Sequence, residues 1–461
     1  MEPLPANVMY YVNQIAGYSK NTVKLQNINS NRAGPGAGAS QTTVTMPTNS
    51  IINLESLALH AQFVGTGVAS GSVNPPTDSA KPNAVYALCP RGGLSALAQR
   101  VSWAAGGIAL DNGPTPYNVI HAIKNNTETC LCKMQSDQRV LNNSTISPYD
   151  VTTNVPAPAP TNLTGQTFDL ICNEWLGFTQ AAPCFLDTNL LPELRLTIQW
   201  ESNDVLPVQY EGTVLGGASS GGNAPAQPPD GVSYSLDNMF WTVDVVSFSN
   251  GLLDAMNQRM MAEAGALSVV YPQYQVFSVD AVGPTSSVRG SASTMSLNRV
   301  YGAARKADIN TPETRYSSNQ PPVKCEDNVG FAFNNAFTNF FSDGLTEYQF
   351  KINNAPYPLY RESKLGGYNS IVTSNARAYS DSKGSIIGSR QTWENNCFSP
   401  CISLNHPADQ RFISGLDLRS INSQINWDCF GSGSVGRQQI LMTEQSSLMQ
   451  IGGGRSLQII A

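Results

Sequence analysis

The chain has 461 residues, enough for two or three domains of ordinary size. Charged residues make up 13%, against roughly 25% in an average soluble domain, and the net charge is −6 with Lys and Arg scattered singly. These values exclude a basic surface that neutralises phosphates, so we expect no direct, sequence-specific binding of nucleic acid.

The beginning of the chain, MEPLPANVMYYVNQIAG, lacks a charged segment followed by a continuous apolar one, so we expect no signal peptide. No apolar run approaches the roughly 18 residues that span a bilayer, and we expect no transmembrane segment. Tyr10, Tyr11, Val12 and Ile15 have helix-like spacing within residues 1–21. We interpret these residues as an N-terminal arm, with a frayed terminus as the alternative.

Segments with alternating apolar and β-branched residues recur between clusters of Gly, Pro, Asn and Ser, which is typical of β-sandwiches and barrels. The candidate strands of the first half are 22–28, 41–46, 56–65, 99–107, 194–200 and 239–248. Those of the second half are 267–279, 293–304, 347–353, 423–430, 438–443 and 456–461. We therefore predict an all-β fold with few short helices.

The best helix candidate is GLLDAMNQRMMAEAG, residues 251–265, where Gly265 would end the helix. Its apolar residues at near-helical spacing are Leu252, Leu253, Met256, Met260 and Met261. This segment lies between the two sets of strands. We therefore place the domain boundary just before it, which divides the chain into 22–250 and 251–461.

Long polar segments interrupt the strands at 65–83, 142–166, 216–231 and 305–328. They are too long to be plain connections, and on a β-sandwich they would be excursions from one end. For 216–231, disordered decoration remains an open alternative.

Cys397, Cys401 and His406 lie within ten positions of one another. A structural zinc site usually needs two pairs of ligands, and here Pro407 follows His406 without a second pair. We interpret the segment as a turn at 399–400 that leads into a strand, with a metal site as the alternative. The nine cysteines are odd in number and irregularly spaced, which indicates free thiols in a reducing compartment.

Motifs for nucleotide binding, serine hydrolases and zinc proteases are missing from the sequence. Cys130 and Cys132 form the other close thiol pair, and His60, His121 and His406 are far apart. We expect no catalytic residue, no cofactor-binding residue and no metal ligand. A pair of carboxylates for glycoside hydrolysis stays open, although nothing singles out two of them.

The segment QTTVTMPTNSIINLESLALHAQFVG, residues 41–65, resembles double jelly-roll major capsid proteins, above all those of polinton-like viruses and virophages in the adenovirus hexon-like lineage. In that family an alternating strand reaches a Pro, a short polar turn and an (I/L)(I/L)(N/D)L-x-S-L stretch. The matching residues are Met46, Pro47, Thr48, Asn49, Ser50, Ile51, Ile52, Asn53, Leu54 and Leu57. Further segments that resemble the family in the same order are 92–112, 190–206, 346–361, 412–427 and 447–460.

The resemblance implies two consecutive eight-stranded jelly rolls that stand side by side, with 251–265 between them. It also implies a non-enzymatic structural protein, three chains of which form a pseudo-hexagonal capsomer that tiles the icosahedral shell of a double-stranded DNA virus. The partners would be neighbouring capsomers, minor capsid proteins and penton proteins. The protein would be located in the virion and assembled inside the host cell.

Two alternative functions would place the protein in other classes. A β-sandwich adhesin or carbohydrate-binding fibre protein would use Trp and Tyr side chains as platforms for sugars. A β-sandwich glycosidase has less support.

Overall fold

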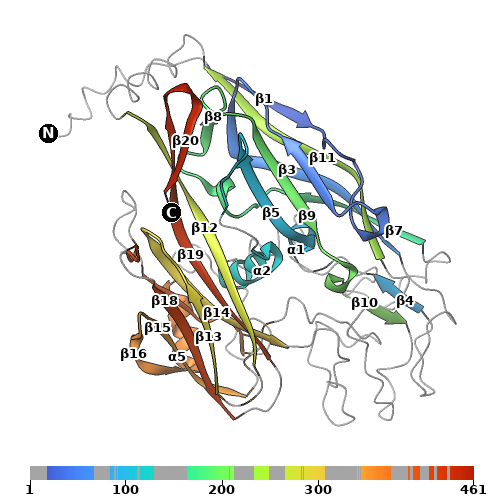
Figure 1. The fold of residues 1–461 in the computed structure, drawn as a ribbon. Coiled ribbons are helices and arrows are strands. Elements are labelled where there is room, and N and C mark those ends of the chain that lie inside the picture. The colour runs from blue at the N-terminus through green and yellow to red at the C-terminus, as the bar shows by residue number, and fades with distance from the viewer. Residues whose placement is uncertain are drawn as a thin grey trace, which may run out of the picture.

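The computed structural model describes the chain from residue 18 to residue 460 with gaps. The described residues are 18–66, 84–87, 90, 92–111, 115–128, 164–206, 208–211, 233–248, 265–281, 283, 285–306, 340, 342, 344–374, 393–394, 398–404, 415–419, 423–432 and 437–460. Most of them form strands, which pair antiparallel in four larger sheets and one two-stranded ribbon (Figure 1).

The first sandwich is built from residues of the first half of the chain. One sheet has the order β1 (Tyr18–Leu25), β11 (Ser233–Phe248), β3 (Ile51–Thr66) and β7 (Thr164–Cys172), and β8 (Phe185–Asp187) also pairs with β3. The other sheet has the order β2 (Gln41–Thr45), β9 (Leu194–Trp200), β5 (Ala98–Ala105) and β6 (Ile108–Ala109). In β9, every second residue of LRLTIQW is buried, so the alternation in the sequence directly determines which face lines the core.

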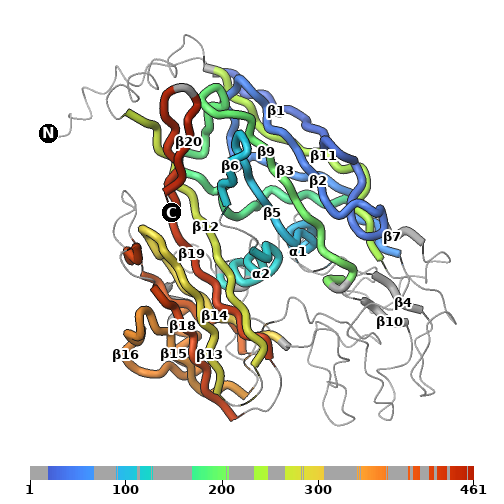
Figure 2. Tube along the Cα trace, viewed as in Figure 1, coloured from blue at the N-terminus to red at the C-terminus, as the bar shows by residue number. Residues whose placement is uncertain are grey.

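The second sandwich is built from residues of the second half. One sheet has the order β12 (Leu267–Ala281), β19 (Arg437–Gly452), β14 (Leu297–Lys306) and β17 (Cys401–Ser403), and β20 (Ser456–Ile460) pairs with β19. The other has the order β13 (Thr285–Ser291), β18 (Gln424–Gly431), β15 (Leu345–Ile352) and β16 (Ala355–Ser363). Figure 2 shows the long strands β12 and β19 side by side between the two halves of the molecule.

Both sandwiches have the same topology. When the eight principal strands of each are numbered in chain order, one sheet reads 1-8-3-6 and the other reads 2-7-4-5. This is the double-sheet arrangement of a jelly roll. The prediction of an all-β chain with two eight-stranded jelly rolls is therefore confirmed.

The same turn joins the fourth and fifth strands of each jelly roll. Gly106 and Gly107 connect β5 to β6 with φ of 57° and 88°, and Asn353 and Asn354 connect β15 to β16 with φ of 52° and 65°. Two central residues with positive φ are what a two-residue type I′ hairpin requires, and Gly and Asn adopt that conformation most readily.

Few helices accompany the strands. They are α1 (Gly93–Leu97), α2 (Tyr117–Glu128) and α5 (Lys364–Ser374), with single 3₁₀ turns at Pro35–Ala37, Phe178–Gln180, Asn203–Val205 and Gly453–Arg455. Both α2 and α5 lie between the fifth and sixth strands of their own jelly roll. A small ribbon of β4 (Ala84–Ala87) and β10 (Val208–Glu211) completes the described elements.

The buried apolar residues form two clusters, one mainly in each jelly roll, and each contains large aromatic side chains. Trp103 and Trp241 lie in the first cluster, and Trp393 and Trp427 lie in the second. The indole of Trp427 packs directly on Gly302 of β14, where a Cβ atom would come within 2.5 Å of the ring. Only glycine leaves room for this contact between the two sheets.

All twelve strands expected from the sequence overlap strands of the structure. β1 begins at Tyr18, because residues 18–21 pair with Val245–Phe248, so the strand takes in the last four residues of the expected arm. The expected helix 251–265 lies outside the described residues, apart from Gly265, as do residues 1–17. Most of the expected loops 65–83, 142–166, 216–231 and 305–328 also lie outside them.

Candidate assembly interface

Helix α2 belongs to the first jelly roll by sequence but packs into both halves (Figure 1). Its Tyr117 joins the core of the first jelly roll, whereas Val119, Ile120 and Ile123 join the core of the second. Residues three and four positions apart lie on one face of a helix, which explains how one short helix presents a continuous apolar stripe to β14 and β19.

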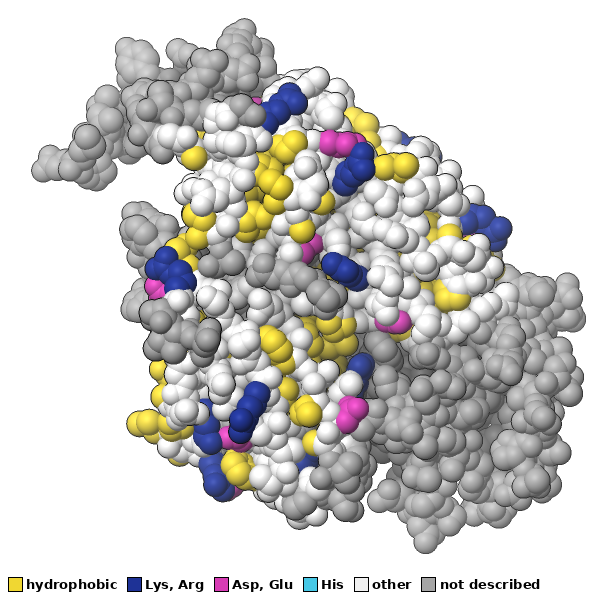
Figure 3. All heavy atoms as spheres, in the orientation of Figure 1, with side chains coloured by type: hydrophobic (Ala, Val, Ile, Leu, Met, Phe, Trp, Pro, Cys, Tyr) yellow, Lys and Arg dark blue, Asp and Glu magenta, His cyan; other side chains and the backbone are white. Residues whose placement is uncertain are grey.

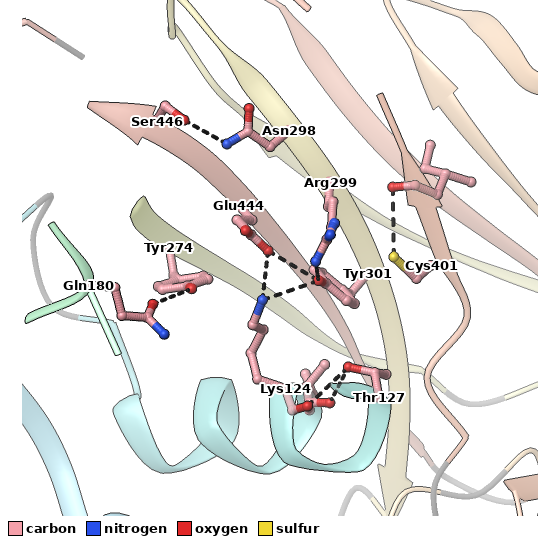
Figure 4. A network of polar contacts seen from close by, with 12 residues as sticks. Lys124, Thr127, Gln180, Tyr274, Asn298, Arg299, Tyr301, Cys401, Glu444 and Ser446 are labelled. Atoms are coloured by element: carbon pink, nitrogen blue, oxygen red, sulfur yellow. Dashed lines mark hydrogen bonds and ion pairs between the residues drawn. The ribbon is translucent and has the colours of Figure 1, made fainter. Parts of the chain in front are cut away.

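A buried ion pair lies at the end of this stripe. The Nζ atom of Lys124 is 2.9 Å from Oε2 of Glu444 in β19, and the two side chains are 7% and 13% exposed. The hydroxyl of Tyr301 in β14 donates to the same carboxylate oxygen at 3.1 Å, and Lys124 donates to that hydroxyl at 3.5 Å. Figure 4 shows the three groups converging from α2, β19 and β14.

The charges of this network determine the protonation of Glu444. Burial by itself would raise the pKa of its carboxyl group, but the positive charges of Lys124 and Arg299 outweigh it and hold the pKa below its usual value. The carboxylate is therefore ionised at neutral pH. Removing Lys124 would leave a charge in the protein interior that has lost its closest partner, which is costly.

Polar contacts join the two jelly rolls at the edge of β12 as well. The backbone carbonyl of Leu110 accepts a hydrogen bond from the hydroxyl of Tyr271 at 2.8 Å and another from Nε2 of Gln273 at 2.6 Å. Ala182 and Val270 exchange two backbone hydrogen bonds of 2.7 and 3.0 Å, which extends the sheet of β12 by one bridge. The chain thus presents its two jelly rolls as one joined unit.

Asp111 lies next to this contact. Its carboxylate accepts a hydrogen bond from the backbone N–H of Trp103 at 2.6 Å. Burial raises the pKa of Asp111 to about 6, although this hydrogen bond and the charge of Arg100 act in the opposite direction. Ionised Asp111 is therefore a destabilising element of the folded chain at neutral pH.

The end of the molecule formed by β16 and α5 carries exposed apolar side chains (Figure 3). Leu359 is 87% exposed, Tyr360 65%, Leu365 50% and Tyr357 38%. β16 is also the last strand of its sheet, so one side of its backbone is unpaired within the described sheet. Exposed apolar residues on an edge strand are typical of a surface that another chain covers.

A second cluster lies on the outer face of the sheet β1–β11–β3. Lys24 of β1 places its Nζ atom 4.0 Å from the ring centre of Phe240, and that ring stacks on His60 of β3 at 4.5 Å. Nε2 of His60 lies 3.1 Å from the hydroxyl of Thr242. Burial and the charge of Lys24 lower the pKa of His60, which favours the neutral imidazole.

Of the two close thiol pairs and the neighbouring His406 that the sequence singles out for metal or thiol chemistry, the structure describes Cys401. Cys401 is buried in β17, with its Sγ atom 3.7 Å from the carbonyl oxygen of Ile402. Cys397, His406, Cys130 and Cys132 lie outside the described residues.

The remaining histidines lie apart, His60 in β3 and His121 in α2. Within the described ranges no three His, Cys, Asp or Glu side chains gather in a way that could hold a metal ion. The cysteines described there, Cys172, Cys184, Cys401 and Cys429, are free thiols. Among the helices of these ranges, none is long and apolar enough to cross a membrane.

Comparison with known proteins reveals a likeness in structure only. No family model matches the sequence, and no curated protein matches it. VP54 of PBCV-1, as fitted into a cryo-EM reconstruction of the virophage Sputnik, matches with a TM-score of 0.57 and 11% identity, over 97% of this chain and 98% of that one.

Other solved structures match over similar lengths. The Faustovirus major capsid protein matches with a TM-score of 0.56 and 11% identity, over 95% of this chain and 91% of that one. The Sputnik virophage structure solved by cryo-EM matches with a TM-score of 0.55 and 10% identity, over 96% of this chain and 88% of that one. The chain therefore has the double jelly-roll fold of these viral capsid structures.

Sequence reasoning missed the residues that join the two jelly rolls. In α2 the signal was present, because Ile120, Ile123, Lys124 and Thr127 have the three-and-four spacing of one helix face. The partner of Lys124 has no such signal, since Glu444 lies 320 positions away in a strand whose only other charged residue is Arg437.

Proposed function

We propose that this chain is the major capsid protein of a double-stranded DNA virus. Three copies assemble into a pseudo-hexagonal capsomer, and such capsomers tile an icosahedral shell. The mechanism is assembly, in which apolar and neutral polar surface is buried first within the homotrimer and then in weaker contacts between capsomers. The chain is a structural protein and not an enzyme, and it needs no cofactor.

One observation carries this proposal. Two jelly rolls of the same strand order are joined in one chain by a buried ion pair and a shared helix. Such a unit supplies two similar sides of a ring, so three copies supply six. The likeness in fold to the Faustovirus major capsid protein, over 95% of this chain, supports the same function.

The low charge content agrees with assembly. Only 13% of the residues are charged, and the face in Figure 3 shows charged side chains singly or in small groups. Charged groups are costly to desolvate at the core of an interface, so an uncharged flank favours extensive contact between copies.

The parts of the chain take separate roles in this proposal. Residues 22–250, together with the first four residues of β1, and residues 251–461 are the two jelly-roll domains. The residues before β1 are an arm that binds a neighbouring chain or a minor capsid protein. The loops 65–83, 142–166 and 305–328 form the outward-facing tower. The further partners are neighbouring capsomers and penton proteins. Assembly takes place inside the host cell in a reducing compartment, in agreement with the free thiols of Cys172, Cys184, Cys401 and Cys429.

Oligomeric state and particle shape test the proposal against its alternatives. Light scattering of the purified chain should give three times the chain mass of 49.4 kDa, and negative-stain images should show a hexagonal outline. A monomer that binds glycans would indicate an adhesin or fibre protein. Glycoside hydrolysis that disappears on substitution of a carboxylate pair would indicate a glycosidase.

A further inference from the structure

The two jelly rolls correspond to each other element by element. Each has the strand order 1-8-3-6 and 2-7-4-5, each joins its fourth and fifth strands by a two-residue turn with positive φ, and each places a helix between its fifth and sixth strands. Each of these helices, α2 and α5, also contacts the fourth strand of its own jelly roll, β5 or β15. α5 is therefore the counterpart of α2.

The contact inside the chain uses a different side of each jelly roll. The first contributes its α2 side, and the second contributes the outer face of its first, eighth and third strands, β12, β19 and β14. Lys124 of α2 reaches Glu444 of β19 and Tyr301 of β14 there. Because α2 covers this face, Met442 and Tyr301 have no exposed surface.

Each jelly roll therefore has one side that takes no part in the contact between the two jelly rolls of the chain. The second jelly roll has its α5 side, where Leu365 is 50% exposed and the neighbouring strand β16 presents Leu359 and Tyr360. The first has the outer face of β1, β11 and β3, the counterparts of β12, β19 and β14. Figure 1 shows α5 and β16 at one end of the molecule and β1, β11 and β3 at the opposite end.

The outer face of β1–β11–β3 already carries a cluster at the counterpart position. Lys24, Phe240 and His60 come from the first, eighth and third strands, as Tyr274, Glu444 and Tyr301 do in the second jelly roll. The ring of Phe240 is only partly buried in the single chain, with Lys24 on it from one neighbouring strand and His60 from the other. An aromatic ring of this kind at the centre of a polar face is a suitable anchor for apolar side chains of a partner.

We infer that the α5 side of one copy docks on the β1–β11–β3 face of a second copy, in the manner in which α2 docks on β12, β19 and β14 within the chain. The inference rests on the proposed capsomer and specifies which surfaces form it. The contact is head-to-tail, because the two surfaces differ and lie at opposite ends. A head-to-tail contact that alternates with a similar contact inside each chain closes a ring of six jelly rolls from three chains.

A charge placed in the docking surface tests this inference. Leu365→Glu changes a half-exposed side chain, so the single chain should fold as before. At the contact it would bury a carboxylate against apolar groups, and the dissociation constant of the trimer should rise about tenfold or more. Ile108→Glu is the matched control, since Ile108 is 42% exposed but belongs to neither docking surface.

Three outcomes of this experiment separate the two proposals. Trimers that dissociate on dilution for Leu365→Glu but not for Ile108→Glu support the inference. Trimers of Leu365→Glu as tight as those of the unchanged chain, or equal weakening by both variants, overturn it while the capsid proposal stands. An unchanged chain that stays monomeric contradicts the capsid proposal itself and this inference with it.

Chemical cross-linking tests the same contact without weakening it. In a chain that carries Leu365→Cys and Lys24→Cys, a bismaleimide link between positions 365 and 24 has to join two copies, because α5 and β1 lie at opposite ends of one chain. Peptide mass spectrometry should find this link in trimers. Links from position 365 to strands outside β1, β11 and β3 would overturn the inference.

Discussion

Lys124 and Glu444 form a buried ion pair of 2.9 Å between two jelly rolls, across 320 positions of sequence. Tyr301 donates a hydrogen bond to the same carboxylate, and Arg299 helps to keep it ionised. The pair thus connects the helix of one jelly roll to the central strands of the other. Its charges are satisfied only while the two halves stay together.

Replacement of Lys124 by Met should destabilise the folded chain by about 3 kcal/mol, because Glu444 would stay buried without its closest counter-charge. The double variant Lys124→Met with Glu444→Gln should recover most of the loss, since both charges are then gone. Urea unfolding of the three proteins measures this. Arg419→Met is the control, because its 2.6 Å pair with Asp417 is about half exposed and should contribute little. Equal instability of the single and double variants would contradict the account.

Replacement of Asp111 by Asn should stabilise the chain at pH 7. The pKa of Asp111 is raised by burial to about 6, so the folded state binds a proton more tightly than the unfolded state. The stability of the unchanged chain should therefore fall as pH rises from about 4 to about 6 and stay low above that. A shift of about 2 units corresponds to a gain of up to about 3 kcal/mol for the variant at pH 7.

The melting temperatures of the unchanged chain and of Asp111→Asn are measured in the same buffers at pH 4.5 and pH 7. The difference between the two proteins should be larger at pH 7. Asp417→Asn is the control. Arg419 holds the pKa of Asp417 below its usual value, at about 2, so this substitution should give no gain at neutral pH. A stability of Asp111→Asn that falls with pH as steeply as that of the unchanged chain would contradict the assigned role.

Replacement of Gly302 by Ala should cost about 1–3 kcal/mol, because the new methyl group would overlap the fully buried indole of Trp427. The matched control is Gly453→Ala, where a Cβ atom meets nothing within 4 Å. Thermal unfolding of the two variants and the unchanged chain measures this difference in stability. A neutral Gly302→Ala would mean that the sheets of the second jelly roll are spaced more widely than described.

Replacement of Thr443 by Val should be neutral or stabilising. The hydroxyl of Thr443 is fully buried and has no hydrogen-bond partner within the described part of the chain, so a methyl group of the same shape removes an unfavourable polar group. Thr188→Val is the matched control, because the hydroxyl of Thr188 has a hydrogen-bond partner. It donates to the carbonyl of Ser50 at 2.7 Å. Its loss should cost about 1–3 kcal/mol in urea unfolding. A Thr443→Val variant that loses as much would show that its hydroxyl has a partner.

The sequence predicts the long strands well because half of each strand faces a core. Buried and less buried residues alternate along the whole of β9, and the predicted range 194–200 coincides with its bounds. β13 was missed since only Val288 and Gly290 of TSSVRGS are buried, which leaves little apolar signal. β6, β8 and β17 have two or three residues each and depend on neighbouring strands rather than on their own pattern.

From the sequence one could predict that copies of the chain make contact, but not which of the proposed surfaces form it. The family resemblance and the low charge content indicated contact between copies, but not which faces make it. α2 and α5 have 12 and 11 residues. Helices of this length obtain most of their stability from tertiary packing, so local sequence carries little information about them.

The mass of the purified chain in solution, measured by light scattering, tests the central claim most directly. The account predicts a particle of three times 49.4 kDa, with a hexagonal outline in negative stain. A folded chain that stays at 49.4 kDa over the accessible range of concentration would contradict it.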